Sequence, residues 1–255
     1  MTASMKAPAV AEPAPLPRAP SRHEPEEQRD DALAPAALQK LMAWLSPAFP
    51  VGGFSYSHGL EWAIEDGTVT NAAALGLWLT AILRHGAGRS DAILFCHAWR
   101  AAEHEIAAIA ELAAAFQPSR ERHLESTAQG KAFLLAVAAA WPNERVAALT
   151  RLFSDRALPL PVAIAGAASA HDIPLGPALN ASLTAFAANI ISAGVRAIPI
   201  GQTDGQRLLA EMAPVITAVA DEAIDASLDD LGGAALRADI ASMKHETQYT
   251  RLFRS

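Results

Sequence analysis

The chemically active residue types of this chain are densest in a short segment near residue 55. Gly53-Phe54-Ser55-Tyr56-Ser57 begins like the nucleophile elbow of a serine hydrolase. That motif ends in glycine and follows a strand, whereas Ser57 stands in its last position here. His58 and Glu61 come next, and they would serve a small enzyme as a base with a nearby carboxylate. The alternative, which we favour, is that His58 ties the segment to the following helix by hydrogen bonds.

Two other histidines raise the question of a metal site. His97 and His104 stand seven residues apart and would share a face if one helix ran through both, with Glu103 and Glu105 nearby. Imidazole nitrogen is a ligand for nickel and zinc. A stable site needs more ligands than two histidines, so a metal-binding protein is an alternative and not the main interpretation. No phosphate-binding glycine loop is found in the sequence, and any nucleotide would have to come with a partner.

Composition excludes several classes of function. The net charge of −7 and the isoelectric point near 5.6 argue against a nucleic-acid surface, which needs clustered Lys and Arg. The single cysteine, Cys96, excludes an internal disulfide framework and fits a buried, inert thiol in the reducing cytoplasm. Residues 173–195 carry no charge and are long enough to cross a membrane, but they include two prolines and several polar side chains. We expect a buried helix at the bundle centre or at a homodimer interface, and no membrane contact.

Helical periodicity dominates the chain after residue 31. Residues 1–31 form a disordered arm by composition, since prolines recur too densely for helix or sheet. Apolar residues then recur at intervals of three and four, and no segment alternates with a period of two. The predicted helices lie near residues 38–45, 75–83, 90–101, 104–116, 119–140, 143–153, 160–170, 176–196 and from 208 onward, where Pro214 should kink the last one. The fold class is therefore all-α, a single domain of about ten helices over residues 32–242.

Two connectors between helices are predicted to have a fixed backbone conformation. In the first, residues 46–61, prolines fix backbone angles and Gly52 and Gly53 permit positive φ. In the second, residues 198–206, Thr203 and Gln206 have the spacing of a capping box, with Thr203 as the N-cap. The glycines of this connector and the helix start also present amide groups to a partner or an anion.

The last segment, residues 243–255, differs from the chain before it. It carries a net charge of +2 in a chain whose net charge is −7. Tyr249, Leu252 and Phe253 stand at i, i+3 and i+4, with Arg251 and Arg254 between and after them. A cationic, aromatic terminus of this kind docks either on its own domain or on another chain, and the sequence leaves both open.

Three separate segments together resemble the UreF-type urease accessory proteins. They read SPAFPVGGFSYSHGLE at 46–61, SAGVR at 192–196 followed by GQTDGQ at 201–206, and SMKHE at 242–246 followed by RLFRS at 251–255. The resemblance implies a cytoplasmic, all-α, dimeric scaffold without chemistry of its own. It further implies that this scaffold binds a UreD (UreH)-type accessory protein and recruits the UreG-type GTPase, which carries nickel, to the urease apoprotein.

Site assignments follow from the connectors, the tail and the resemblance. We expect no catalytic residue, no metal ligand and no cofactor, because nickel and GTP would be handled by partners. The residues expected to bind partners are Phe54, Tyr56, His58, Gly201, Gln202, Asp204, Tyr249, Arg251, Leu252, Phe253 and Arg254. Arg196, Gln202 and Asp204 are candidates for modulating a partner GTPase. They are chosen only because their side chains are polar or charged.

Overall fold

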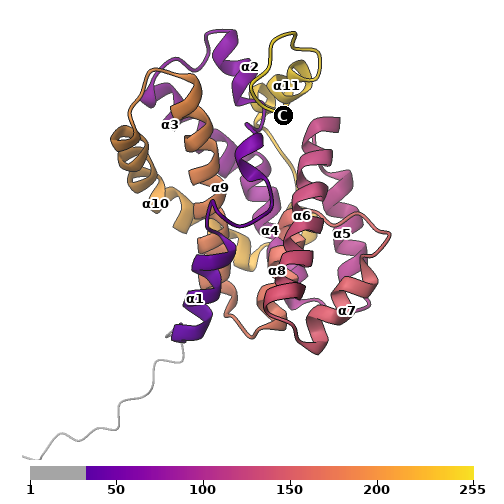
Figure 1. The fold of residues 1–255 in the computed structure, drawn as a ribbon. Coiled ribbons are helices and arrows are strands. Elements are labelled where there is room, and N and C mark those ends of the chain that lie inside the picture. The colour runs from indigo at the N-terminus through magenta and orange to yellow at the C-terminus, as the bar shows by residue number, and fades with distance from the viewer. Residues whose placement is uncertain (1–32) are drawn as a thin grey trace, which may run out of the picture. The chain divides into compact units, whose positions relative to one another are not determined.

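The protein folds as a bundle of helices (Figure 1). The structure, a computed structural model, describes residues 33–255, and the predicted disordered arm 1–31 lies outside this part of the chain. Within residues 33–255 there are eleven α-helices, two short 3-10 helices and no strand, which confirms the all-α prediction. The helices are α1 Pro35–Trp44, α2 Leu60–Glu65, α3 Ala72–His85, α4 Ala87–Arg100, α5 Ile106–Ala115, α6 Arg120–Ala140, α7 Glu144–Leu152, α8 Leu160–Ala170, α9 Leu175–Ala197, α10 Gln202–Asp225 and α11 Leu236–His245, with η1 Gly53–Ser55 and η2 Leu228–Asp230.

The uncharged helix α9 lies at the centre of the bundle. It packs against α10, α8, α4, α2 and α3, and its buried side chains include Leu179, Leu183 and Ile190. Among the described residues, α9 is the single helix with the length and hydropathy to span a membrane. Burial of one face against five neighbouring helices is the arrangement of a core helix, as predicted for residues 173–195. Cys96 of α4 is also fully buried, and burial raises the pKa of its thiol to about 11.

Several helix starts are fixed by short polar side chains. Asn71, Ser119 and Asn143 each accept a hydrogen bond from a backbone amide in the first turn of α3, α6 and α7. These contacts satisfy amides that have no partner inside the helix. The predicted cap of α10 is wrong: the N-cap is Gly201, whose amide donates to the Asp204 carboxylate at 3.1 Å. Thr203 instead lies inside the helix, which continues through Pro214 as one element.

Two glycines allow close approach between elements. Gly59, at φ +75°, precedes α2, and a Cβ there would lie 2.6 Å from the backbone nitrogen of Ser242 in α11. A Cβ on Gly130 of α6 would lie 1.9 Å from the carbonyl oxygen of Leu158. Only glycine fits at these contacts, so α11 lies against the start of α2 and α6 lies against the chain that leads into α8. Neither α2 nor α11 was among the predicted helices.

Candidate functional site

The first connector, the end of α9 and the C-terminal tail meet at one place. Arg196, near the end of α9, donates from Nη1 to the carbonyl oxygen of Phe54 at 2.7 Å. Its guanidinium carbon also lies 4.5 Å from the ring centroid of Phe253. The amide of Arg254 donates to the carbonyl oxygen of Ser55 at 2.8 Å. Residues from three distant parts of the sequence therefore form one structural unit, which we call the tail cluster.

Glu61 is the acceptor that holds the tail. Its two carboxylate oxygens accept hydrogen bonds from the amides of Leu252, at 2.6 Å, and Phe253, at 3.0 Å. The Nε2 of His245, in α11, lies 3.1 Å from the same carboxylate. Backbone amides that face a buried carboxylate form charge-assisted hydrogen bonds, which are stronger than neutral ones. Glu61 thus fixes the tail by its backbone, whatever side chains the tail carries.

A second carboxylate, Glu121 of α6, completes this arrangement. It accepts from Arg251 at 2.6 Å and lies 2.6 Å from His245 Nδ1. His245 is fully buried, with each ring nitrogen facing a different carboxylate. His245 therefore joins Glu61 of α2 to Glu121 of α6.

His58 belongs to a buried polar group on α6. Its Nδ1 lies 2.5 Å from Arg122 Nη1 and 2.7 Å from Glu125 Oε1, while Arg122 and Glu125 pair at 2.5 Å. Burial, and then the Arg122 charge, lower the pKa of His58, while the Glu125 carboxylate opposes both effects. Burial alone would raise the pKa of Glu125, but Arg122, His58 and a hydrogen bond from Ser255 bring it down to about 2. The predicted anchoring role of His58 fits these contacts, although its partners lie on α6 and not on the following helix.

The predicted partner-binding residues differ in exposure. Phe253 is 6% exposed and packs in the core of its own chain. Of the two alternatives left open for the tail, this side chain therefore docks on its own domain. Tyr249 and Leu252 are 102% and 75% exposed, and neither side chain joins the core. Tyr56, like His58, is buried, whereas Phe54 projects to the surface.

The second connector lies outside the tail cluster. Gly201 and Gln202 are exposed, and among residues 33–255 Asp204 bonds only with its neighbours Gly201 and Arg207. The structure therefore joins the first connector with the tail and leaves the second as a separate surface.

The histidines of the metal alternative do not share a helix. α4 ends at Arg100, and His104 lies in the exposed turn that follows. The Nε2 of His97 lies 3.1 Å from the carbonyl oxygen of Ala226. Within residues 33–255, no three side chains of His, Cys, Asp and Glu are placed to hold a metal ion together. The expectation that the chain needs no metal or cofactor of its own stays a prediction.

The α6 residues of this site were not predicted from the sequence. Arg122, Glu125, Ser126 and Gln129 are all buried and follow the i, i+3, i+4, i+7 spacing of one helix face. A polar row with helical spacing signals a buried polar contact surface, just as an apolar row signals a core face. This spacing of polar residues in the sequence could have indicated the buried polar face of α6.

Comparison with known proteins gives the family of the chain. The model of the UreF family matches residues 69–213. A urease accessory protein UreF of Rhodopseudomonas palustris (strain BisB5) is 54% identical over 224 residues, which cover 86% of this chain and 92% of that protein. The chain belongs to the UreF family. The protein of the same name from Bradyrhizobium sp. (strain ORS 278) is 51% identical over 228 residues, which cover 86% of this chain and 92% of the relative. Membership of the UreF family confirms the resemblance carried by the three sequence segments.

Proposed function

We propose that this protein is a non-catalytic scaffold of urease maturation. It would bridge a UreD-type accessory protein and the UreG-type GTPase, acting as a cytoplasmic homodimer that brings nickel to the urease apoprotein. Family membership supports the maturation role, because the relatives carry the name urease accessory protein. Nickel and GTP would be handled by the partners.

The observation that carries the scaffold proposal is an exposed apolar surface at the C-terminal end of the domain. Leu236, Ile240 and Met243 follow one face of α11, and each is at least half exposed. Tyr249 and Leu252, on the tail that follows α11, are exposed as well. Groups of exposed apolar side chains mark protein interaction sites, and tyrosine is enriched at binding hot spots. We call these five residues the C-terminal apolar surface and assign it to the UreD-type partner.

The anchoring of the tail makes this surface rigid before any partner binds. Glu61 and Glu121 fix the backbone and side chains on either side of Leu252. A preorganised surface loses little conformational entropy on binding. Glu61 is occupied by the tail and His58 by Arg122 and Glu125, so the pair of the enzyme alternative is engaged in structural contacts, which favours a scaffold.

The turn at Gly201, Gln202 and Asp204 is the second surface in this proposal. Its residues are exposed or partly exposed and lie outside the tail cluster. We assign it to the UreG-type GTPase, with Gln202 as the side chain able to reach a partner. Arg196 is less suited to that role because its guanidinium is engaged by Phe54 and Phe253.

Co-purification with the UreD-type and UreG-type proteins, followed by a nickel-dependent urease activation assay, tests this function. The double variant Tyr249→Ala, Leu252→Ala should lose the UreD-type partner and most activation while keeping its melting temperature, because both side chains lie outside the core. Leu77→Ala in α3 is the matched control, since Leu77 is also 75% exposed but far along the chain from the tail. Normal co-purification and activation by the double variant would contradict the assignment of this surface.

A further inference from the structure

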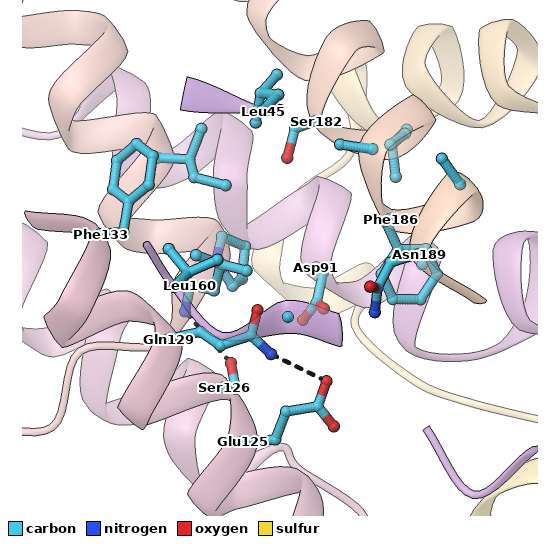
Figure 2. Close-up of a pocket in the computed structure, with 18 of the residues that line it drawn as sticks. Leu45, Asp91, Glu125, Ser126, Gln129, Phe133, Leu160, Ser182, Phe186 and Asn189 are labelled. Carbon is cyan, nitrogen blue, oxygen red and sulfur yellow. Dashed lines mark hydrogen bonds between the residues drawn. The ribbon is translucent and has the colours of Figure 1, made fainter. Parts of the chain in front are cut away.

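A cavity of about 230 Å³ lies between the first connector, α4, α6 and α9 (Figure 2). A single water needs roughly 10–15 Å³ on the same kind of measure, so the space is large enough for an organic group. Its walls are largely aromatic and aliphatic. The larger apolar side chains that line it are Trp44, Phe54, Phe95, Phe133, Leu183 and Phe186.

Gln129 presents an unused acceptor to this cavity. The side chain is 5% exposed, and its Nε2 donates to Glu125 Oε1 at 3.2 Å. A carboxylate only accepts, so the amide nitrogen must face Glu125 and Oε1 must point the other way. No hydrogen bond from residues 33–255 reaches Oε1, which lies 3.5 Å from the place a Cβ would take on Gly53. A ligand that donates to Oε1 would therefore gain a hydrogen bond that no described residue supplies.

Other polar side chains line the same space. The Asp91 carboxylate of α4 and the Asn189 amide of α9 line the cavity with Gln129 (Figure 2). Arg122 is a lining cation, but Glu125 and His58 already occupy its guanidinium. Between its apolar walls the cavity therefore offers two acceptors, the Asp91 carboxylate and the Gln129 carbonyl oxygen, beside serine hydroxyls and the Asn189 amide, which both donate and accept.

This chemistry selects one class of ligand. An anion would meet carboxylate and carbonyl oxygens, and an apolar molecule would leave the Gln129 oxygen unpaired. A planar organic cation donates several hydrogen bonds in a plane and stacks on aromatic rings. We propose that the cavity binds a guanidinium or amidinium group, with Gln129 and Asp91 accepting its N–H groups and Phe186 lying beside it. The group could belong to a free small molecule or to an arginine of a partner protein.

Binding depends on the charge of Asp91. Burial, opposed by Arg122 and reinforced by Glu125, raises the pKa of Asp91 to about 6. Glu125, with its pKa of about 2, stays ionised over the same range, and the Arg122 guanidinium lies beside it. Burial and the Arg122 charge lower the pKa of His58, the third titratable group here. Affinity for an organic cation should therefore be lower at pH 5 than at pH 8.

Calorimetry on the full chain with benzamidine tests the proposal, with neutral benzamide as the isosteric probe. Benzamidine should bind at least tenfold more tightly than benzamide at pH 8, and Asp91→Asn should remove that preference and its pH dependence. Gln129→Met, which removes the acceptor at similar volume, should weaken benzamidine binding severalfold. Glu111→Gln is the matched control, since Glu111 pairs with Arg156 on the surface. Equal binding of both probes, or no binding of benzamidine, would overturn the proposal.

A further experiment distinguishes the two sources of the cation, a free small molecule and an arginine of a partner protein. A capped peptide with one arginine is compared with the same peptide carrying citrulline, which keeps the shape without the charge. Charge-dependent binding of the peptide supports a partner's arginine, whereas binding of benzamidine alone supports a free small molecule. These measurements use the isolated chain, so they do not depend on the urease assay.

Discussion

The guanidinium of Arg196 lies over the ring of Phe253, with its central carbon 4.5 Å from the ring centroid. The same guanidinium donates to the carbonyl oxygen of Phe54 at 2.7 Å. One side chain on α9 thus contacts both the first connector and the tail. A cation over an aromatic face contributes about 0.5–2 kcal/mol, and the hydrogen bond fixes its direction. Each of the three segments that carry the family resemblance therefore contributes a residue to one contact, although residues 201–206 of the middle segment lie outside it.

Phe253 is expected to stabilise the protein's own fold. Phe253→Ala should lower the free energy of unfolding by about 3–5 kcal/mol, the usual cost of removing a buried aromatic side chain. Leu252→Ala is the adjacent control, because its side chain is 75% exposed and leaves no cavity. Chemical denaturation of both variants measures the difference. Equal, small effects would show that the tail does not belong to the core.

Glu61 is expected to keep the tail in place. Glu61→Gln removes the charge that faces two backbone amides and His245, so the free energy of unfolding should fall by about 2–4 kcal/mol. Trypsin should then cleave after Arg251 or Arg254 faster than in the parent protein. Glu222→Gln, at an exposed position of α10, should change neither quantity. An unchanged cleavage rate in Glu61→Gln would refute the anchoring role.

Most of the fold was accessible from the sequence because long helices bury one face. The spacing of apolar residues at intervals of three and four located α3, α6, α8 and α9 to within a few residues. For α3, the predicted segment began at residue 75, whereas the helix begins at Ala72. The six residues of α2 are too few to show such a period, so this helix was missed. α11 was missed although it is longer and Leu236, Ile240 and Met243 have helical spacing; its buried face includes the polar Ser242 and His245, which do not mark a core face in the sequence.

The candidate site was less accessible because its contacts join distant positions. Glu61 bonds residues 191 and 192 positions further along the chain, and no local pattern encodes such a pair. The sequence did indicate the right segments, as shown by Phe54, His58 and Phe253. It did not indicate that Glu61, Glu121 and Glu125 would be the residues that join them, because carboxylates on helices are usually solvated.

Asp91 is expected to lower stability at neutral pH. Its folded pKa of about 6 lies above the ordinary value of 3.8, so the folded state binds the proton more tightly than the unfolded state. The resulting stability is fully present below pH 3.8 and is lost as the pH rises through 6. Asp91→Asn should therefore raise stability by about 2 kcal/mol at pH 8 and much less at pH 4.5. Thermal unfolding at both pH values checks the sign, and an equal change at both would contradict it.

Gly59 is expected to be required for the docking of α11, and a second glycine allows the cause to be separated. Gly59 and Gly67 both have positive φ, at +75° and +81°. A Cβ on Gly67 would meet no atom within 4 Å, whereas one on Gly59 would lie 2.6 Å from the Ser242 backbone nitrogen. Gly67→Ala should therefore cost only the backbone strain, about 1–2 kcal/mol.

Gly59→Ala should cost that strain and a further 1–3 kcal/mol or so for overpacking against α11. Since α11 carries His245, its displacement should also free the tail and speed tryptic cleavage near Arg251, an effect that Gly67→Ala should lack. Chemical denaturation and proteolysis of the two variants side by side give both readings. If the two substitutions cost the same and neither changes cleavage, close approach to Ser242 is not what makes glycine necessary at position 59.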